Sequence, residues 1–506
     1  MAPKPKGLKA SKRAAPFDPS TTVDESAAST STPAASNPER TYPLDEDALT
    51  LADLFELRSS VVDILYPFPN SLSLAHADPD RFDEARSLLR GILHGCAVLE
   101  QFVEPRSYYL LREVDETGPK SLEAVKKRMQ EAGQEKLKAL GLNDEFTEGM
   151  ILYLQGWALQ HLGEIFEKPE EALRAGAIKS ATGSKKRKID VNEPHSKEGW
   201  LEAAYERFDL LFELALASYS QDLRDEYCFV ALINAGYVDC KVSLAEAYYE
   251  AGKDDEATKV ALKSRCRDLS YFIEVAWGID HHDAYVDEHM SSGDAVLAQL
   301  RAWSKYIAFV EAYPSAEPAK AVAELKDGIA LLKLMDRHFS TASEWRNDDE
   351  KKALPLWTFL RDVVATDARL ARFILLEDVV ESTYRPDAGD EEDEEDEEDE
   401  EDEEAEVRPL PLDAKEVVEA KQAGEEALSA LRATITAFSS LPASFAHPSA
   451  KDGQYRKLEE ALLVYSALIN PDEKAATEKI EKEIAQVRKD GGFEEDEEGA
   501  ADRAEK

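Results

Sequence analysis

The segment from Ser243 to Leu269 places the strongest constraint on the fold, because its pattern is that of two helices joined at a glycine. Apolar residues three and four positions apart give the first helix one buried face, and small alanines let a second helix approach that face closely. This spacing is typical of a tetratricopeptide-like hairpin, a unit that builds scaffolds for binding other proteins. The residues that define the hairpin are Leu244, Ala245, Tyr248, Gly252 and Ala257.

Two further segments share features of this hairpin. One helical hairpin cannot bury its own apolar face, so a repeat fold needs about three or more units. Leu162 and Ala175 repeat the spacing of Leu244 and Ala257, although the second helix of that unit runs into a Lys-rich stretch. The segment from Trp200 to Leu216 carries one broad apolar stripe, for which a place in the core is the plain interpretation. The sequence therefore predicts an irregular array of helices.

The rest of the chain also follows the helical period, as in residues 80–102, 294–313 and 356–380. We find no convincing run of alternating strand residues, and no Asn-Gly or Asp-Gly hairpin between β-branched runs. We predict an all-α fold, an irregular tetratricopeptide-like α-solenoid. We expect a disordered basic tail at 1–43, and then the array at 44–384 with an exposed basic loop at 180–197. An acidic disordered linker is expected at 385–408 and an acidic disordered tail at 491–506. Between them, residues 409–490 should form C-terminal helices that cap or extend the array or form a small separate bundle.

Two clusters of cations lie in segments whose composition predicts loops. The first seventeen residues contain no acid and no apolar core of signal-peptide length, so secretion is not expected. No segment approaches about eighteen uninterrupted apolar residues, so no transmembrane helix is expected either. Adjacent Lys and Arg in an extended loop suit the groove of a nuclear import receptor, whereas a solvated loop is the plain alternative. The clusters are Lys4, Lys6, Lys9, Lys12 and Arg13, and Lys185, Lys186, Arg187 and Lys188.

The overall charge argues against stable binding of nucleic acid. Lys and Arg total 61 against 104 Asp and Glu, a formal charge of −43 that repels a phosphate backbone. Asp390 to Glu404 are fifteen consecutive acidic residues, and the remainder of the chain still carries 28 net negative charges. Such a block stays extended, and it either keeps the protein soluble or docks on basic partners such as ribosomal proteins or histones.

Sequence motifs of catalysis are missing. There is no Gly-rich phosphate loop, no G-x-S-x-G elbow, no H-E-x-x-H and no paired C-x-x-C. Four separated cysteines are expected to be buried, reduced thiols: Cys96, Cys228, Cys240 and Cys266. A candidate metal site contains an H-x-D pair, a pattern that supplies iron ligands when it lies on a strand. The residues on either side here follow the helical period, so a helix end or a surface cluster is the preferred interpretation. The residues of this candidate site are His281, His282, Asp283, Asp287 and His289. We expect no enzyme, no metal and no cofactor.

The order of these parts resembles the fungal enhancer of translation termination family. The likeness runs from the Lys-rich start PKGLKASKR through the helical segments LYLQGWALQHLGEIF and SLAEAYYEAGKDDEA to the acidic linker and the final helices. It concerns organisation rather than a short diagnostic motif, so no functional residue is transferred. The acidic block is also longer than is typical of the family.

The resemblance implies a nuclear regulator of translation termination and of hypoxic, oxygen-dependent gene expression. The family includes a negative regulator that binds a 2-oxoglutarate- and iron-dependent prolyl hydroxylase. We therefore expect a nuclear adaptor, with some shuttling to the cytoplasm, whose partners are this hydroxylase and an import receptor. Tyr249, next to the core-facing Tyr248, is a candidate partner anchor, with an ordinary surface tyrosine as the alternative. The second hypothesis is an acidic escort of basic ribosomal proteins or histones, and the third is an unrecognised enzyme.

Overall fold

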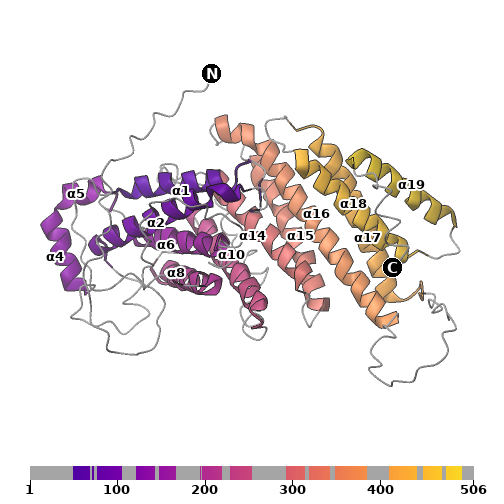
Figure 1. Ribbon diagram of the computed structural model, residues 1–506, viewed down its shortest axis with the longest axis horizontal. Helices are drawn as coiled ribbons and strands as arrows, with labels where there is room; N and C mark the ends of the chain where they lie inside the picture. Colours follow the sequence, from indigo (N-terminus) through magenta and orange to yellow (C-terminus); the bar gives the residue numbers. More distant parts are fainter. Residues whose placement is uncertain are drawn as a thin grey trace, which may run out of the picture.

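A computed structural model describes most of the helical part of the chain (Figure 1). The described residues are 49–68, 71–72, 74, 77–104, 121–142, 147–166, 194, 196–218, 228–253, 292–313, 318–341, 348–384, 410–441, 448–469 and 474–492.

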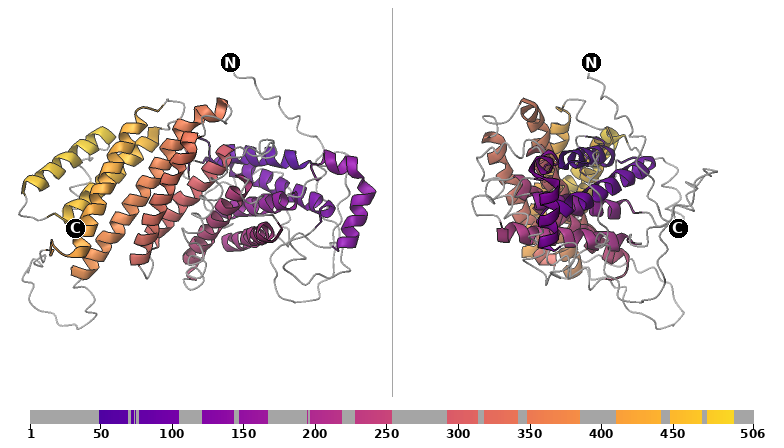
Figure 2. Two further views of the ribbon diagram at one scale, coloured as in Figure 1. Left: turned by 180° about the vertical axis from the view of Figure 1, so that it is seen from behind. Right: turned by 90° about the vertical axis from the view of Figure 1, so that its left-hand side faces the viewer.

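The prediction of an all-α fold is confirmed. Among the described residues the structure has α-helices and short 3-10 turns but no strand, and the helices follow one another along an elongated body (Figures 1 and 2). The helices are α1 (Leu51–Leu65), η2 (Pro79–Arg81), α2 (Phe82–Leu99), η3 (Glu100–Phe102), α4 (Leu122–Ala132), α5 (Gln134–Ala139), α6 (Thr147–Glu164), α8 (Lys197–Ser218), α10 (Cys228–Glu250), α14 (Ser292–Ala312), α15 (Pro318–Thr341), α16 (Asp348–Tyr384), α17 (Lys415–Phe438), α18 (Pro448–Ala467) and α19 (Lys474–Gly491).

The first helix begins at a capping box. The side chain of Thr50 accepts a hydrogen bond from the Asp53 N–H, and the Asp53 carboxylate accepts one from the Thr50 N–H. These bonds satisfy backbone donors that the first turn of a helix leaves unpaired. The beginning of α1 is therefore fixed by its local sequence.

Glycines allow α6, α8 and α10 to pack closely. The ring of Phe208 in α8 is fully buried. A Cβ atom at Gly156 of α6 would lie 3.1 Å from this ring, and one at Gly236 of α10 would lie 2.7 Å from it. Gly163 of α6 faces Leu201 of α8 in the same way, at 2.9 Å. Helix α8 thus packs against both α6 and α10 through positions without a side chain.

The structure describes the first helix of the predicted hairpin. Helix α10 ends near the expected glycine, and Gly252 takes a positive φ of 69°, the left-handed conformation that glycine adopts without steric cost. The Lys253 N–H donates to the Tyr248 carbonyl oxygen at 2.8 Å and closes the end of the helix. Ala257 and the second helix of the hairpin lie outside the described residues.

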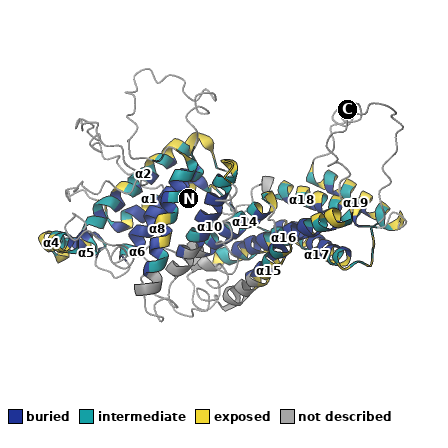
Figure 3. Cartoon of the chain, turned by 90° about the horizontal axis from the view of Figure 1, so that it is seen from below, coloured by how far each residue is buried: buried dark blue, intermediate teal, exposed yellow. Residues whose placement is uncertain are grey.

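The C-terminal helices pack in order. Helix α15 packs along α16, α17 along the next side of α16, α18 along α17, and α19 along α18. Helix α16 also contacts α14 and α18 and is therefore the most enclosed of this group, and many of its described residues are buried (Figure 3). No described helix is long and apolar enough to cross a membrane.

Candidate partner-binding surface

An aromatic cluster lies where α10 and α14 end side by side. Asp239 contacts Lys305 in the middle of the two helices, and Tyr249 contacts Tyr313 at their C-terminal ends, so the helices run parallel. The rings of Tyr249 and Tyr313 are stacked, with centroids 4.7 Å apart and planes 7° from parallel. Phe309 completes the cluster, 6.0 Å from Tyr249 and 5.3 Å from Tyr313 between ring centroids. All three side chains are only partly buried.

Carboxylates surround this cluster. Tyr313 has a raised pKa because burial and the negative charges of Glu246 and Glu250 disfavour its phenolate. Glu250 also forms an ion pair with Lys197, at 2.9 Å. Aromatic faces next to carboxylates attract Lys and Arg side chains through cation–π and ionic interactions. We call Tyr249, Phe309 and Tyr313 the aromatic cluster. This cluster is suited to a cationic side chain of a partner protein.

A buried ionic cluster lies on the same seam, two to three turns earlier in each helix. Lys305 of α14 donates hydrogen bonds to Glu164 of α6 and, at 2.7 Å, to Asp239 of α10. Ser243 also donates to Glu164, at 3.0 Å, and His161 lies 3.8 Å from the same carboxylate. The side chain of Glu164 is only 7% exposed. Three helices are therefore joined at one group of charges.

The charges in this cluster stabilise each other's ionised forms. Burial opposes ionisation of Glu164, but Lys305 and His161 outweigh it and lower its pKa to about 2. Burial likewise opposes the charge of Lys305, yet Asp239 and Glu164 raise its pKa well above the usual range. Burial lowers the pKa of His161. A lysine that stays protonated is neither a nucleophile nor a general base, so we interpret the cluster as structural.

A small cavity of about 240 Å³ opens beside the ionic cluster. The Arg301 guanidinium lies 3.8 Å from the centroid of the Tyr66 ring, and Tyr66 contacts His161 at 3.4 Å between the hydroxyl oxygen and Nε2. This volume is below the range of about 300–1,000 Å³ that is usual for ligand pockets. We therefore place the candidate site at the aromatic cluster.

The structure places four of the predicted scaffold residues and the predicted anchor on α10 or directly after it. Leu244 and Ala245 are buried. Tyr248 packs beside Leu244 and donates a hydrogen bond from its hydroxyl to Glu202, at 2.7 Å. Tyr249 points to the other side, toward α14. Gly252 forms the turn after the helix.

Several predicted features lie outside the described residues. These are the two basic clusters (Lys4, Lys6, Lys9, Lys12 and Arg13; Lys185, Lys186, Arg187 and Lys188), the acidic block Asp390–Glu404, the group from His281 to His289, Ala257 and Cys266. Cys96 and Cys240 are buried free thiols, as expected. Burial raises the pKa of both thiols and makes them unreactive. Within the described ranges, no group of His, Cys, Asp and Glu could hold a metal ion.

Sequence reasoning missed Phe309, Tyr313 and the ionic cluster. Tyr313 and Tyr249 are far apart in the sequence, and their stacking depends on the parallel packing of α10 and α14. The sequence holds a weak indication of the cluster: Phe309 and Tyr313 are four residues apart, so the two rings lie on one face of a helix.

Comparison with known proteins gives a weak structural likeness. No protein-family model matches the chain, and no curated protein matches it. Among solved structures, the nuclear import adaptor Nro1 of S. pombe is similar, with 10% sequence identity and a TM-score of 0.43 over 87% of this chain and 93% of the Nro1 chain.

Proposed function

We propose that this chain is a non-catalytic nuclear adaptor that binds another protein through the aromatic cluster. Three partly buried rings beside carboxylates, at the end of a seam between two long helices, are the observation that carries the proposal. Aromatic residues in partly desolvated positions dominate the energetics of many protein interfaces. The two basic clusters, Lys4–Arg13 and Lys185–Lys188, support import into the nucleus.

The partner that we propose is a 2-oxoglutarate- and iron-dependent prolyl hydroxylase. The support is the order of parts along the chain, which resembles the enhancer of translation termination family. By holding the hydroxylase, the adaptor would influence correct translation termination and hypoxic gene expression. The scaffold itself needs no metal or cofactor for this role.

The test is a binding titration of the purified full chain against the prolyl hydroxylase encoded in the same genome. The decisive variant carries Tyr249→Leu and Tyr313→Leu, which keep apolar volume but remove both aromatic faces. We expect a loss of affinity of about tenfold or more, because each ring provides cation–π and stacking contacts. The matched control is Tyr455→Leu, since Tyr455 of α18 is also partly buried but lies far along the array.

Thermal unfolding separates binding from stability. The double variant should melt within a few degrees of the parent chain, because leucine still fills the seam. An equal loss of affinity in the Tyr455→Leu control would contradict the proposed surface. Absence of binding by the parent chain would contradict the proposed partner.

The escort of basic proteins is the second candidate function. The fifteen acidic residues from Asp390 to Glu404 favour it, because such a block can bind histones or ribosomal proteins by charge alone. In that case the helical array would only support the acidic block.

A further inference from the structure

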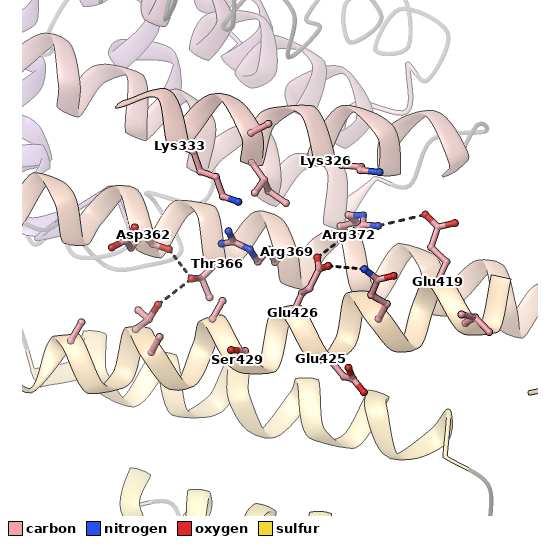
Figure 4. A pocket seen from close by; sticks show the side chains of 18 of the residues that line it. Lys326, Lys333, Asp362, Thr366, Arg369, Arg372, Glu419, Glu425, Glu426 and Ser429 are labelled. Atoms are coloured by element: carbon pink, nitrogen blue, oxygen red, sulfur yellow. Dashed lines mark hydrogen bonds and ion pairs between the residues drawn. The ribbon is translucent and has the colours of Figure 1, made fainter. Parts of the chain in front are cut away.

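A long groove runs over α16 between α15 and α17 (Figure 4). It encloses about 1,550 Å³, which exceeds the range of about 300–1,000 Å³ that is usual for small-molecule pockets. Its α17 wall extends from Lys415 to Ala437. At a rise of about 1.5 Å per residue this wall is about 33 Å long, the length of a helix of about 20 residues. The dimensions therefore suit a helical segment of another protein.

Small and apolar residues line part of both walls. On α15, Ile329 and Ala330 lie beside the groove. On α17, Ala430, Ala433 and Ala437 recur at spacings of three and four residues, so they face the groove together. Small side chains on a groove wall let the backbone of a docked helix approach closely, as in other complexes where an amphipathic helix lies in a groove.

Four of the five carboxylates that line the groove, all but Asp413, have hydrogen-bond or ion-pair partners among the described residues. Glu419 and Glu426 form ion pairs with Arg372, at 3.5 and 3.4 Å. Glu425 accepts a hydrogen bond from the Tyr465 hydroxyl, at 3.2 Å. Asp362 forms an ion pair with Arg361, at 2.6 Å. The negative charge on the α17 side is therefore largely engaged within the protein.

The two lysines on the α15 wall of the groove lack acidic partners among the described residues. Lys326 and Lys333 are exposed, and neither forms a hydrogen bond or ion pair within the described part of the chain. Arg369 donates to the Ala365 carbonyl oxygen at 2.9 Å, and its charge lies near those of Glu426 and Asp362 without an ion-pair contact among the described residues. Figure 4 shows Arg369 on the floor between the two lysines. The Nε atom of Arg372, a residue only 8% exposed, is buried without a hydrogen-bond acceptor in the described structure.

We propose that this groove binds an acidic amphipathic helix of a partner protein. Its carboxylates would meet Lys326, Arg369 and Lys333, and its apolar residues would lie over the alanines of α17. Lys326 and Lys333 are two helical turns apart on one face of α15, so the partner's carboxylates should recur at about i, i+4 and i+7. A helix suits the groove better than a nucleic acid, because the alanines of α17 offer apolar contacts rather than the row of cations that a phosphate backbone requires.

The test measures fluorescence anisotropy with synthetic helical peptides of about 20 residues. One peptide carries Leu on one face and Glu at i, i+4 and i+7 beside it, and two others carry Gln or Lys in place of Glu. The full chain should bind the Glu peptide at least about tenfold more tightly than the other two. Tighter binding of the Lys peptide, or equal binding of all three, would overturn the proposal.

The charge-reversal variant Lys326→Glu with Lys333→Glu should reduce the affinity for the Glu peptide about tenfold or more. Both lysines are exposed, so the variant should fold, and circular dichroism checks this. The matched control is Lys474→Glu with Lys479→Glu on α19, which changes the net charge equally at exposed positions outside the groove. A similar loss in the control would mean that only the overall charge matters. Much tighter binding by a chain that lacks Asp390–Glu404 would identify this chain's own acidic block as the occupant, and would equally overturn the assignment to a partner.

Discussion

At the scale of single residues, the most informative group is the ionic cluster of Lys305, Glu164 and Asp239. The three residues come from three helices, and they are far apart in the sequence. Charged side chains at such positions look like ordinary surface residues when the helices are viewed one at a time. Their burial follows only from the packing of α6, α10 and α14, which periodicity does not specify. For the same reason the sequence singles out Tyr249 as a candidate anchor but not Tyr313, which only helix packing brings beside it.

The substitution Lys305→Met should lower the free energy of unfolding by about 3 kcal/mol at pH 7, because the carboxylates of Glu164 and Asp239 would then stay in the protein without their cation. The effect should lie toward the low end of the usual range for buried pairs, since the Lys305 side chain remains 28% exposed. Urea denaturation followed by circular dichroism measures this change. The control is Lys482→Met, which removes an exposed ion pair with Glu478 and should change stability by less than about 0.5 kcal/mol.

The same cluster predicts how stability depends on pH. The pKa of Glu164 is lowered to about 2, below the 4.5 of an unperturbed glutamate. Its contribution is therefore fully present above pH 4.5, and it is lost as the pH falls from 4.5 toward 2. In Lys305→Met the Glu164 pKa should rise, so this loss should begin at a higher pH. Equal acid-unfolding profiles for the variant and the parent chain would contradict the assignment of Lys305 as the stabilising cation.

At the scale of helices, the sequence predicts the elements well and their contacts poorly. The 3.6-residue period located α2, α14 and α16, and a glycine located the end of α10. The glycines inside helices were harder to interpret, because a helix-interior glycine is normally only unfavourable. Gly156 and Gly236 are explained by Phe208, whose ring lies against both of them. That explanation needs the packing of α6, α8 and α10.

Gly236→Ala should destabilise the chain by about 1–3 kcal/mol, even though alanine is the better helix former, because the new methyl group would overlap the fully buried ring of Phe208. Thermal unfolding measures the change. The control is Gly453→Ala in α18, where a Cβ atom would meet nothing within 4 Å. That substitution should stabilise the chain by about 0.5–1 kcal/mol through helix propensity alone. The same sign for both variants would show that close packing at Gly236 is not the decisive factor.

At the scale of the whole molecule, two features compete to explain partner binding. The helical array offers an aromatic cluster and a groove, both made by residues from different helices. The sequence also offers a net charge of −43, of which the block from Asp390 to Glu404 supplies fifteen charges. Contacts at the aromatic cluster include desolvated apolar groups, which salt barely weakens, whereas the lysine contacts proposed for the groove are between exposed charges. Contacts of the acidic block are between exposed charges. Salt screens such charges beyond a Debye length of about 8 Å at physiological ionic strength, and this length becomes shorter as the salt concentration rises.

Deleting Asp390–Glu404 should therefore leave binding of the prolyl hydroxylase nearly unchanged, within about twofold, and the binding should persist when ionic strength rises from about 0.1 to about 0.5 M. The measurement is a titration of the parent chain and the deletion variant at both salt concentrations, with purified core histones as the comparison ligand. Histones bound by the parent chain should be lost on deletion and at high salt, because that interaction rests on the acidic block. If the hydroxylase follows the same pattern as the histones, the acidic block is the binding surface, and the escort function replaces the adaptor.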